Sequence, residues 1–268
     1  IMNCKTGAYG ANVSVCEDCG AVQIHYNSCR NRCCPMCQAV PKEMWMDARR
    51  EDVLDAPYFH LVFTVPDILN PIIYNNQKLL YDTLYHAASA TISELTADPK
   101  HLGADVGYIC ILHTWGSEMN FHPHIHTILL GGGLTPKNEW KDNGTEFFLP
   151  IGAISKVFRG KYMDELKNLW NTNQLKFHGT AEKYRNHYEF KKLIDSCYDA
   201  EWIPYCKKTF NGAQSVIDYL GKYTHRIAIS NHRIICVDDK NVTFSVKDYR
   251  NKGQWKELTL SGVEFIRR

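Results

Sequence analysis

The chain has 268 residues, 44% of them hydrophobic and 22% charged, a balance typical of a globular protein and not of a disordered one. No apolar run approaches the roughly 18 residues that a transmembrane helix needs, and the N-terminal residues lack the pattern of a signal peptide, so we expect a cytoplasmic protein that contacts no membrane. The net charge of +2 is too small to indicate nucleic-acid binding by itself, so any DNA contact must come from local clusters.

The beginning of the chain is rich in cysteine. Seven of the eleven cysteines lie in the first 37 residues, and in a reducing compartment this density favours metal thiolates over disulfides. Large apolar residues are too few there to form a core, so a metal must replace it. We therefore predict a zinc-binding domain over residues 1–43 and a second domain over 44–268.

Two Cys-x-x-Cys pairs, with fourteen residues between them, predict a tetrahedral structural zinc because each pair presents two sulfurs from one tight turn. The predicted ligands are Cys16, Cys19, Cys34 and Cys37. The remaining candidates are irregularly spaced, so one zinc and two zincs both stay open. The candidates for a second site are Cys4, Cys29, Cys33 and His25.

Arg30 and Arg32 lie between the two cysteine pairs, close to Tyr26. Arginines held on a zinc scaffold suit phosphate contacts, and a solvated turn is the alternative.

Periodicity and turn residues predict the elements of the second domain in chain order. We expect helices over 41–53, 77–97 and 212–223, mostly helical structure over 150–200, and strands over 58–66, 107–115, 122–130, 201–206, 233–237, 242–246 and 255–260. The second and third of these strands form an antiparallel pair around the turn 116–120, and the glycines 131–133 are expected to end the third. Antiparallel strands mixed with unequal helices favour an α+β fold, an antiparallel sheet flanked by helices.

His124 and His126 share one face of the predicted strand because side chains alternate along a strand. Neutral imidazoles bind Mg²⁺, Mn²⁺ or Zn²⁺. Two histidines at this spacing, taken alone, are nevertheless more often hydrogen-bonded core residues than metal ligands. The antiparallel turn brings His113 opposite them as a third ligand, with Glu118 and His122 as substitutes if the register differs. Three imidazoles with open positions are typical of a catalytic site.

Tyr219 and Tyr223 are four residues apart and share one face of the predicted helix. An aromatic packing stripe is the usual explanation of such a pair. Basic residues surround this pair and suit a phosphate: Lys222, His225 and Arg226. A tyrosine can attack a phosphodiester to form a phosphotyrosine while a metal stabilises the leaving 3′ oxygen.

Together these motifs resemble the HUH single-strand endonucleases, and more closely the two-tyrosine transposases of rolling-circle insertion sequences, which carry an N-terminal zinc-binding domain. The resemblance is carried by residues 28–37, 113–116, 122–126, 219–226 and 229–233. It implies the HUH endonuclease fold, with the histidine motif on an antiparallel sheet and the tyrosine helix packed beside it.

By the same resemblance, His124 and His126 would bind catalytic Mg²⁺ or Mn²⁺, and Tyr219 and Tyr223 would be the nucleophiles that cleave and rejoin single-stranded transposon ends through a 5′ phosphotyrosine. It also implies a bacterial protein associated with the nucleoid, and the chain is expected to be a fragment of a longer one. Two alternatives stay open. One is a zinc-dependent nucleic-acid-binding protein without catalysis, and the other is a metal-dependent phosphodiesterase that uses activated water.

Overall fold

The computed structural model describes residues 3–31, 34–142, 149–202, 204–208, 213–224, 229, 231–248 and 253–268. The chain divides into two compact units. The first contains Ile1–Leu54 and Gln214–Ser230, and the second contains Asp55–Ala213 and Asn231–Arg268. In the described part of the chain, no helix combines the length and the apolar character that crossing a bilayer requires.

The first unit consists of a hairpin and two helices. After a 3₁₀ turn, η1 (Gly7–Tyr9), strands β1 (Ala11–Val15) and β2 (Val22–Tyr26) pair antiparallel with both strands exposed. Helix α1 (Pro35–Arg50) begins six residues before the predicted start. Its first residue is Pro35, and proline is compatible with the first turn of a helix. Helix α6 (Ala213–Thr224), as predicted, occupies almost the expected range.

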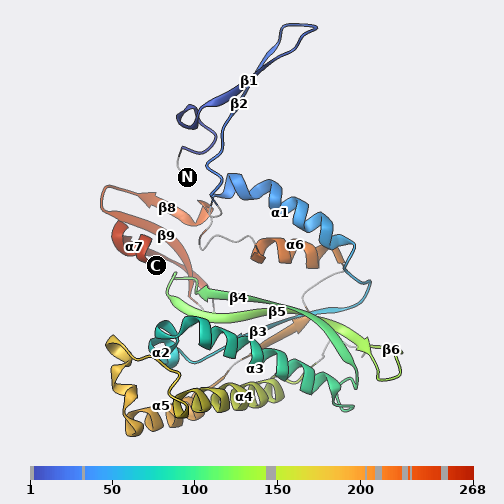
Figure 1. Cartoon of the computed structure of the whole chain (residues 1–268), viewed down its shortest axis with the longest axis vertical. Coiled ribbons are helices and arrows are strands. Elements are labelled where there is room, and N and C mark those ends of the chain that lie inside the picture. The colour runs from blue at the N-terminus through green and yellow to red at the C-terminus, as the bar shows by residue number, and fades with distance from the viewer. Residues whose placement is uncertain are drawn as a thin grey trace. The chain divides into compact units, whose positions relative to one another are not determined.

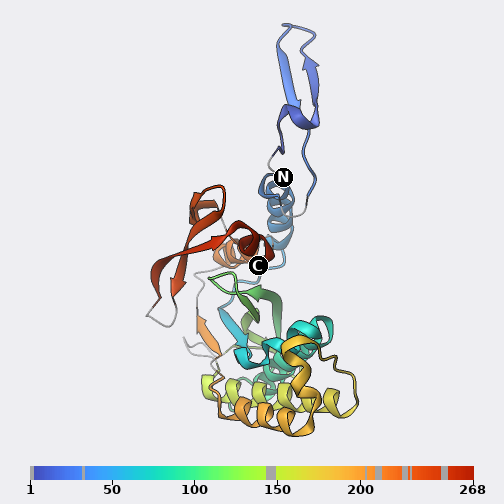
Figure 2. The ribbon, with the colours of Figure 1, turned by 90° about the vertical axis from the view of Figure 1, so that its left-hand side faces the viewer.

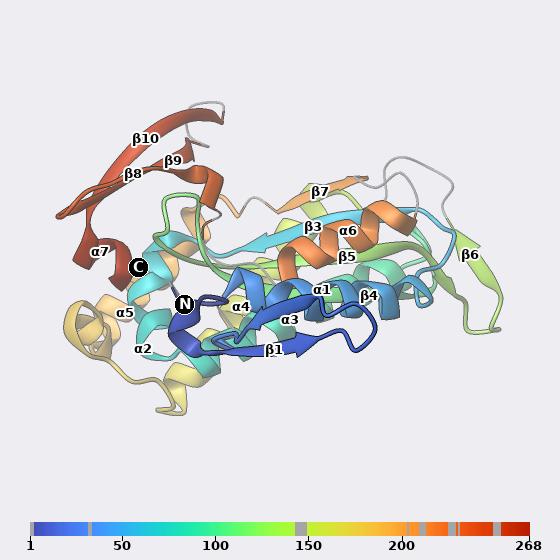
Figure 3. The ribbon, with the colours of Figure 1, turned by 90° about the horizontal axis from the view of Figure 1, so that it is seen from above.

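Helices α1 and α6 lie side by side in the first unit (Figures 1 and 3). Gly221 of α6 is buried, and a Cβ atom there would come within 2.3 Å of the Met46 sulfur of α1. Because Gly221 has no side chain, the Met46 side chain can pack directly against the α6 backbone.

The second unit is built on an antiparallel sheet with strand order β4-β5-β3-β7, and β6 pairs with β5. The predicted strands are confirmed, with the one expected over 201–206 shifted toward the C-terminus. The strands are β3 (Tyr58–Thr64), β4 (Asp105–Trp115), β5 (Phe121–Leu134), β6 (Trp140–Asp142) and β7 (Tyr205–Lys208).

Helices cover one face of this sheet, and α3 and α4 run along it in Figure 1. Phe59, Leu61 and Phe63 of β3 and Ile125 and Leu129 of β5 alternate onto that face and join the buried core. The opposite face therefore carries the other residues of the same strands, including the histidines. The helical segments are η2 (Asp67–Leu69), α2 (Asn70–Asn75), α3 (Gln77–Ala97), α4 (Ile151–Asn171), η3 (Gly179–Arg185) and α5 (His187–Asp199).

The glycines 131–133 do not end β5, contrary to the prediction, since the strand continues to Leu134. A Cβ on Gly133 would lie 2.1 Å from the carbonyl oxygen of Asp105, and one on Gly131 would lie 3.0 Å from that of Pro57. These glycines let neighbouring backbones approach closely, which is the other common use of glycine in a strand.

The end of the chain forms a second sheet, with order β10-β9-β8, and confirms the three predicted strands. The guanidinium of Arg233 donates to the Ser117 carbonyl oxygen at 2.5 Å, and the Lys247 amide donates to the Ser117 hydroxyl at 2.7 Å, so this sheet holds the turn between β4 and β5 (Figure 2). The segments are η4 (Asn231–Arg233), β8 (Ile234–Val237), β9 (Asn241–Asp248), β10 (Gln254–Ser261) and α7 (Gly262–Arg267). Antiparallel sheets with helices confirm the α+β class.

Candidate metal centres and nucleophile helix

Three histidines converge on the face of the sheet that the core helices leave uncovered. His113 of β4 pairs directly with His124 of β5, and His126 lies two residues further along the same face. One ring nitrogen from each lies within 4.8 Å of the other two. The structure thus brings together the three histidines selected from the sequence.

The rings of this triad are held from several sides. His113 is only 3% exposed, and its ring packs against that of Trp115 with centroids 5.0 Å apart. Nδ1 of His124 lies 2.7 Å from the carbonyl oxygen of His122 and must donate to it, since a carbonyl can only accept. Nε2 of neutral His124 therefore keeps its lone pair and lies 3.1 Å from Nε2 of His126.

This donor set fits a divalent cation. Two nitrogens at adjacent positions of an octahedral ion, each ~2.1 Å from it, would be about 3 Å apart, close to the observed separation of the two Nε2 atoms. Three imidazoles leave other positions open for oxygen ligands, as a catalytic cation requires.

His60 of β3 belongs to the same cluster and was not predicted. Its Nε2 lies 2.8 Å from Nδ1 of His126, and only 8% of the residue is exposed. Burial, and to a lesser degree the nearby His124, lower the pKa of His60 to about 4, so its ring is neutral at neutral pH. The only sequence signal was a histidine inside an apolar strand.

The substitutes considered for the third ligand lie outside the triad. The ring of His122 contacts the Asp67 carboxylate at 3.1 Å, and the carboxylate of Glu118 pairs with Lys256 at 2.9 Å. Each therefore has another partner.

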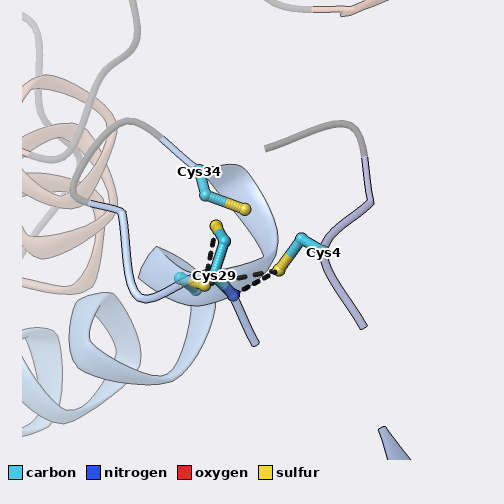
Figure 4. A group of neighbouring side chains, drawn as sticks. Cys4, Cys29 and Cys34 are labelled. Carbon is cyan, nitrogen blue, oxygen red and sulfur yellow. Dashed lines mark hydrogen bonds between the residues drawn. The ribbon is translucent and has the colours of Figure 1, made fainter. Parts of the chain in front are cut away.

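Four cysteines form a second cluster, in the first unit. Cys4, Cys29, Cys34 and Cys37 offer sulfurs within 4.8 Å of one another, and Figure 4 shows three of these side chains turned toward a common centre. The Cys37 sulfur lies 3.5 Å from that of Cys4 and 3.7 Å from that of Cys29.

These distances fit tetrahedral zinc, because four sulfurs ~2.3 Å from an ion have edges of about 3.8 Å. Burial opposes ionisation of Cys37, but hydrogen bonds from Cys4 and Cys29 outweigh it and lower its pKa to about 6. The backbone amide of Cys29 lowers the pKa of the Cys4 thiol, but desolvation and hydrogen bonds to the neighbouring cysteines outweigh it and raise this pKa to about 12. The thiols of the cluster thus hold their protons with unequal affinity, and a bound metal would displace those protons.

The predicted grouping of the cysteines differs from the one that the structure assembles. Cys34 and Cys37 meet Cys4 and Cys29, whereas Cys16 and Cys19 lie exposed at the turn of the hairpin. Strands β1 and β2 separate that turn from the open end of the hairpin, because five residues of strand extend about 17 Å.

The other members of the proposed second site do not join this cluster. His25 lies exposed on β2 opposite Asn12, and Cys33 falls outside the described residues. Hydrogen bonds from the backbone amides of Cys19 and Asp18 lower the pKa of Cys16.

Both tyrosines lie in α6, where Tyr219 is partly exposed. Gly221, which faces α1, is about 200° around the helix from Tyr219, so Tyr219 lies on the side turned away from α1. The side chains of Tyr223 and Lys222 are outside the described part, as are residues His225, Arg226 and Arg32. Arg30 is exposed next to Cys29 and adopts a positive φ of 51°.

Residues 107–268 match a family model described as "Putative transposase". The chain belongs to this transposase family. Residues 1–65 of the transposase match a second model, a transposase zinc-binding domain, in the region that holds the cysteine cluster. The resemblance inferred from the motifs and the predicted enzyme class, a transposase, are thereby confirmed.

Two curated relatives cover nearly all of this transposase. It is 39% identical over 99% of its length to "Putative transposase y4qJ" of Sinorhizobium fredii, and 28% identical over 99% to the transposase for insertion sequence element IS801 of Pseudomonas savastanoi pv. phaseolicola. The chain spans 67% of the first relative and 63% of the second.

Solved structures of the conjugative relaxase TrwC in complex with oriT DNA show a partial likeness. The metal-bound structure is 12% identical, with a TM-score of 0.33 over 61% of this chain and 70% of that one. A copper-bound structure is 14% identical, with a TM-score of 0.32 over 68% and 75%.

Proposed function

We propose that this transposase cleaves and rejoins the single-stranded DNA ends of its transposon through a 5′ phosphotyrosine, assisted by Mg²⁺ or Mn²⁺ at His113, His124 and His126. The observation that carries the proposal is the convergence of these three imidazoles on the sheet face opposite the core helices, in a family of transposases. The same chain carries two tyrosines four residues apart in α6.

The tyrosines are the proposed nucleophiles. The phenol oxygen of Tyr219 or Tyr223 attacks the phosphorus, the bond to the 3′ oxygen breaks, and the phenol proton passes to that leaving oxygen. A bound cation would polarise the phosphate and stabilise the charge that develops on the 3′ oxygen. The phosphotyrosine conserves the energy of the broken bond, so the 3′ hydroxyl of another strand can reverse the reaction, and the second tyrosine permits a further cleavage before the first bond is resolved.

Single-stranded DNA is the proposed partner, bound on the sheet face that carries the histidines. Tyr205 and Lys207 of β7 are exposed and lie on that face, because they pair with Val62 and His60 of β3. An aromatic ring and a cation suit a base and a phosphate. Further phosphate contacts are assigned to Arg30, Arg32, Lys222, His225 and Arg226.

The four clustered cysteines are proposed to hold one structural zinc that takes the place of a core in the first unit. Acting on element DNA, the transposase would work in the bacterial cytoplasm, at the nucleoid.

The test uses single-stranded oligonucleotides that cover both ends of the element, incubated with the full chain and Mn²⁺. A label on the 3′ end stays with the fragment esterified to tyrosine, so we expect a labelled protein adduct from wild type and none from the double variant Tyr219→Phe, Tyr223→Phe. Tyr188→Phe is the control, because this exposed tyrosine of α5 lies outside the proposed machinery. Cleavage without an adduct would favour activated water, and binding without cleavage would favour a binding protein.

A further inference from the structure

The contact between His60 and His126 has the geometry of a hydrogen bond that orients a metal ligand. The rings are nearly parallel, at 8°, with centroids 5.1 Å apart. Face-to-face stacking is excluded because Nε2 of His60 and Nδ1 of His126 are only 2.8 Å apart, less than the ~3.5 Å between stacked atoms. The rings therefore meet edge to edge in nearly one plane, where the nitrogen lone pairs lie.

The strand register explains how His60 reaches this position. Val62 of β3 pairs directly with His126, so His60, two residues earlier, is a diagonal neighbour on the same face. The ring of His60 also meets the ring of Tyr205 of β7 at an interplanar angle of 63°, with centroids 5.5 Å apart. His60 is thus held between two strands, with Nε2 directed at His126.

We propose that His60 is a positioning residue that fixes the orientation and the tautomer of His126. Its bond to Nδ1 directs Nε2 of His126 toward His124. In the proposed arrangement Nε2 of His60 accepts this bond, so neutral His126 carries its proton on Nδ1 and keeps the Nε2 lone pair for a cation. The carbonyl oxygen of His122 does the same for Nδ1 of His124. His60 is not itself a ligand, because its Nε2 is hydrogen-bonded to Nδ1 of His126 and so contacts the side of that ring away from the proposed cation.

This inference rests on the proposed cation site, and the test measures Mn²⁺ binding to the full chain without DNA, by calorimetry and by electron paramagnetic resonance. His60→Phe keeps a ring but loses the acceptor, and we expect its Mn²⁺ affinity to fall about 10- to 100-fold. His60→Gln places an amide oxygen near the lost nitrogen and should recover most of the affinity, whereas the shorter His60→Asn should not. The resonance spectrum of bound Mn²⁺ should change in the Phe and Asn variants and return toward wild type in Gln.

The control is Thr127→Val, which removes another buried polar contact of β5, to the Cys110 sulfur at 3.3 Å, and should leave Mn²⁺ affinity unchanged. Equal affinity in wild type and all His60 variants, with His124→Ala abolishing binding, would overturn the role of His60 and leave the cation site standing. Binding that survives His124→Ala would instead overturn the cation site, and the role of His60 with it. If His60→Phe does not fold, the comparison of Gln with Asn decides.

Discussion

At the scale of single residues, two physical causes place the three ligands of the histidine triad. Alternation along β5 puts His124 and His126 on one face, and this was predictable from sequence. Antiparallel pairing brings His113 opposite His124, which the position of the turn predicted. His60 was not predictable, because its role depends on a diagonal contact between residues 66 positions apart in the chain.

The cysteines give a prediction at this scale. Cys4→Ser should remove zinc and unfold the first unit, since it leaves three thiolates where tetrahedral zinc needs four. Cys16→Ser, at the exposed hairpin turn, should keep that zinc. Metal content by mass spectrometry and thermal unfolding would check both. Loss of the same zinc in Cys16→Ser with retention in Cys4→Ser would restore the grouping predicted from sequence.

At the scale of elements, β5 shows how one residue type supports two opposite interpretations. Three consecutive glycines suggest the end of a strand, yet in β5 they allow Asp105 and Pro57 to approach the strand closely. Sequence alone cannot separate these uses, because the neighbouring backbone comes from distant segments. By contrast α3, whose apolar periodicity is local, begins and ends where it was predicted.

We therefore expect Gly133→Ala to destabilise the second unit by about 1–3 kcal/mol, since its Cβ would overlap the Asp105 carbonyl and force β4 and β5 apart. Gly152→Ala in α4 is the matched control. Its Cβ meets no atom within 4 Å, and alanine is favoured over glycine in a helix by about 0.5–1 kcal/mol, so stability should be unchanged or higher. Denaturant unfolding of both variants measures the difference, and equal stability would show that the strands can separate without cost.

At the scale of the whole molecule, the transposase combines two donor sets of different softness in two units. Four thiolates suit zinc and bind it tightly, whereas three imidazoles with open positions suit a cation that exchanges with solvent. The first set is expected to stabilise structure and the second to serve the reaction.

A chelator should separate the two roles. Brief treatment with EDTA is expected to stop cleavage while circular dichroism and zinc content stay unchanged, and added Mn²⁺ should restore cleavage. A thiol-reactive mercurial should release zinc and unfold the first unit. Simultaneous loss of zinc, fold and cleavage at one EDTA concentration would contradict two independent sites.

The sequence by itself determined the features that depend on local periodicity: the α+β class, the helix that carries both tyrosines, and the strand that displays His124 and His126. Only the tertiary structure decided which cysteines meet, that β5 continues through its glycines, and that His60 supports His126. The physical reason is the same in each case. These features are contacts between segments far apart in the chain, and a local pattern does not determine which distant segments meet.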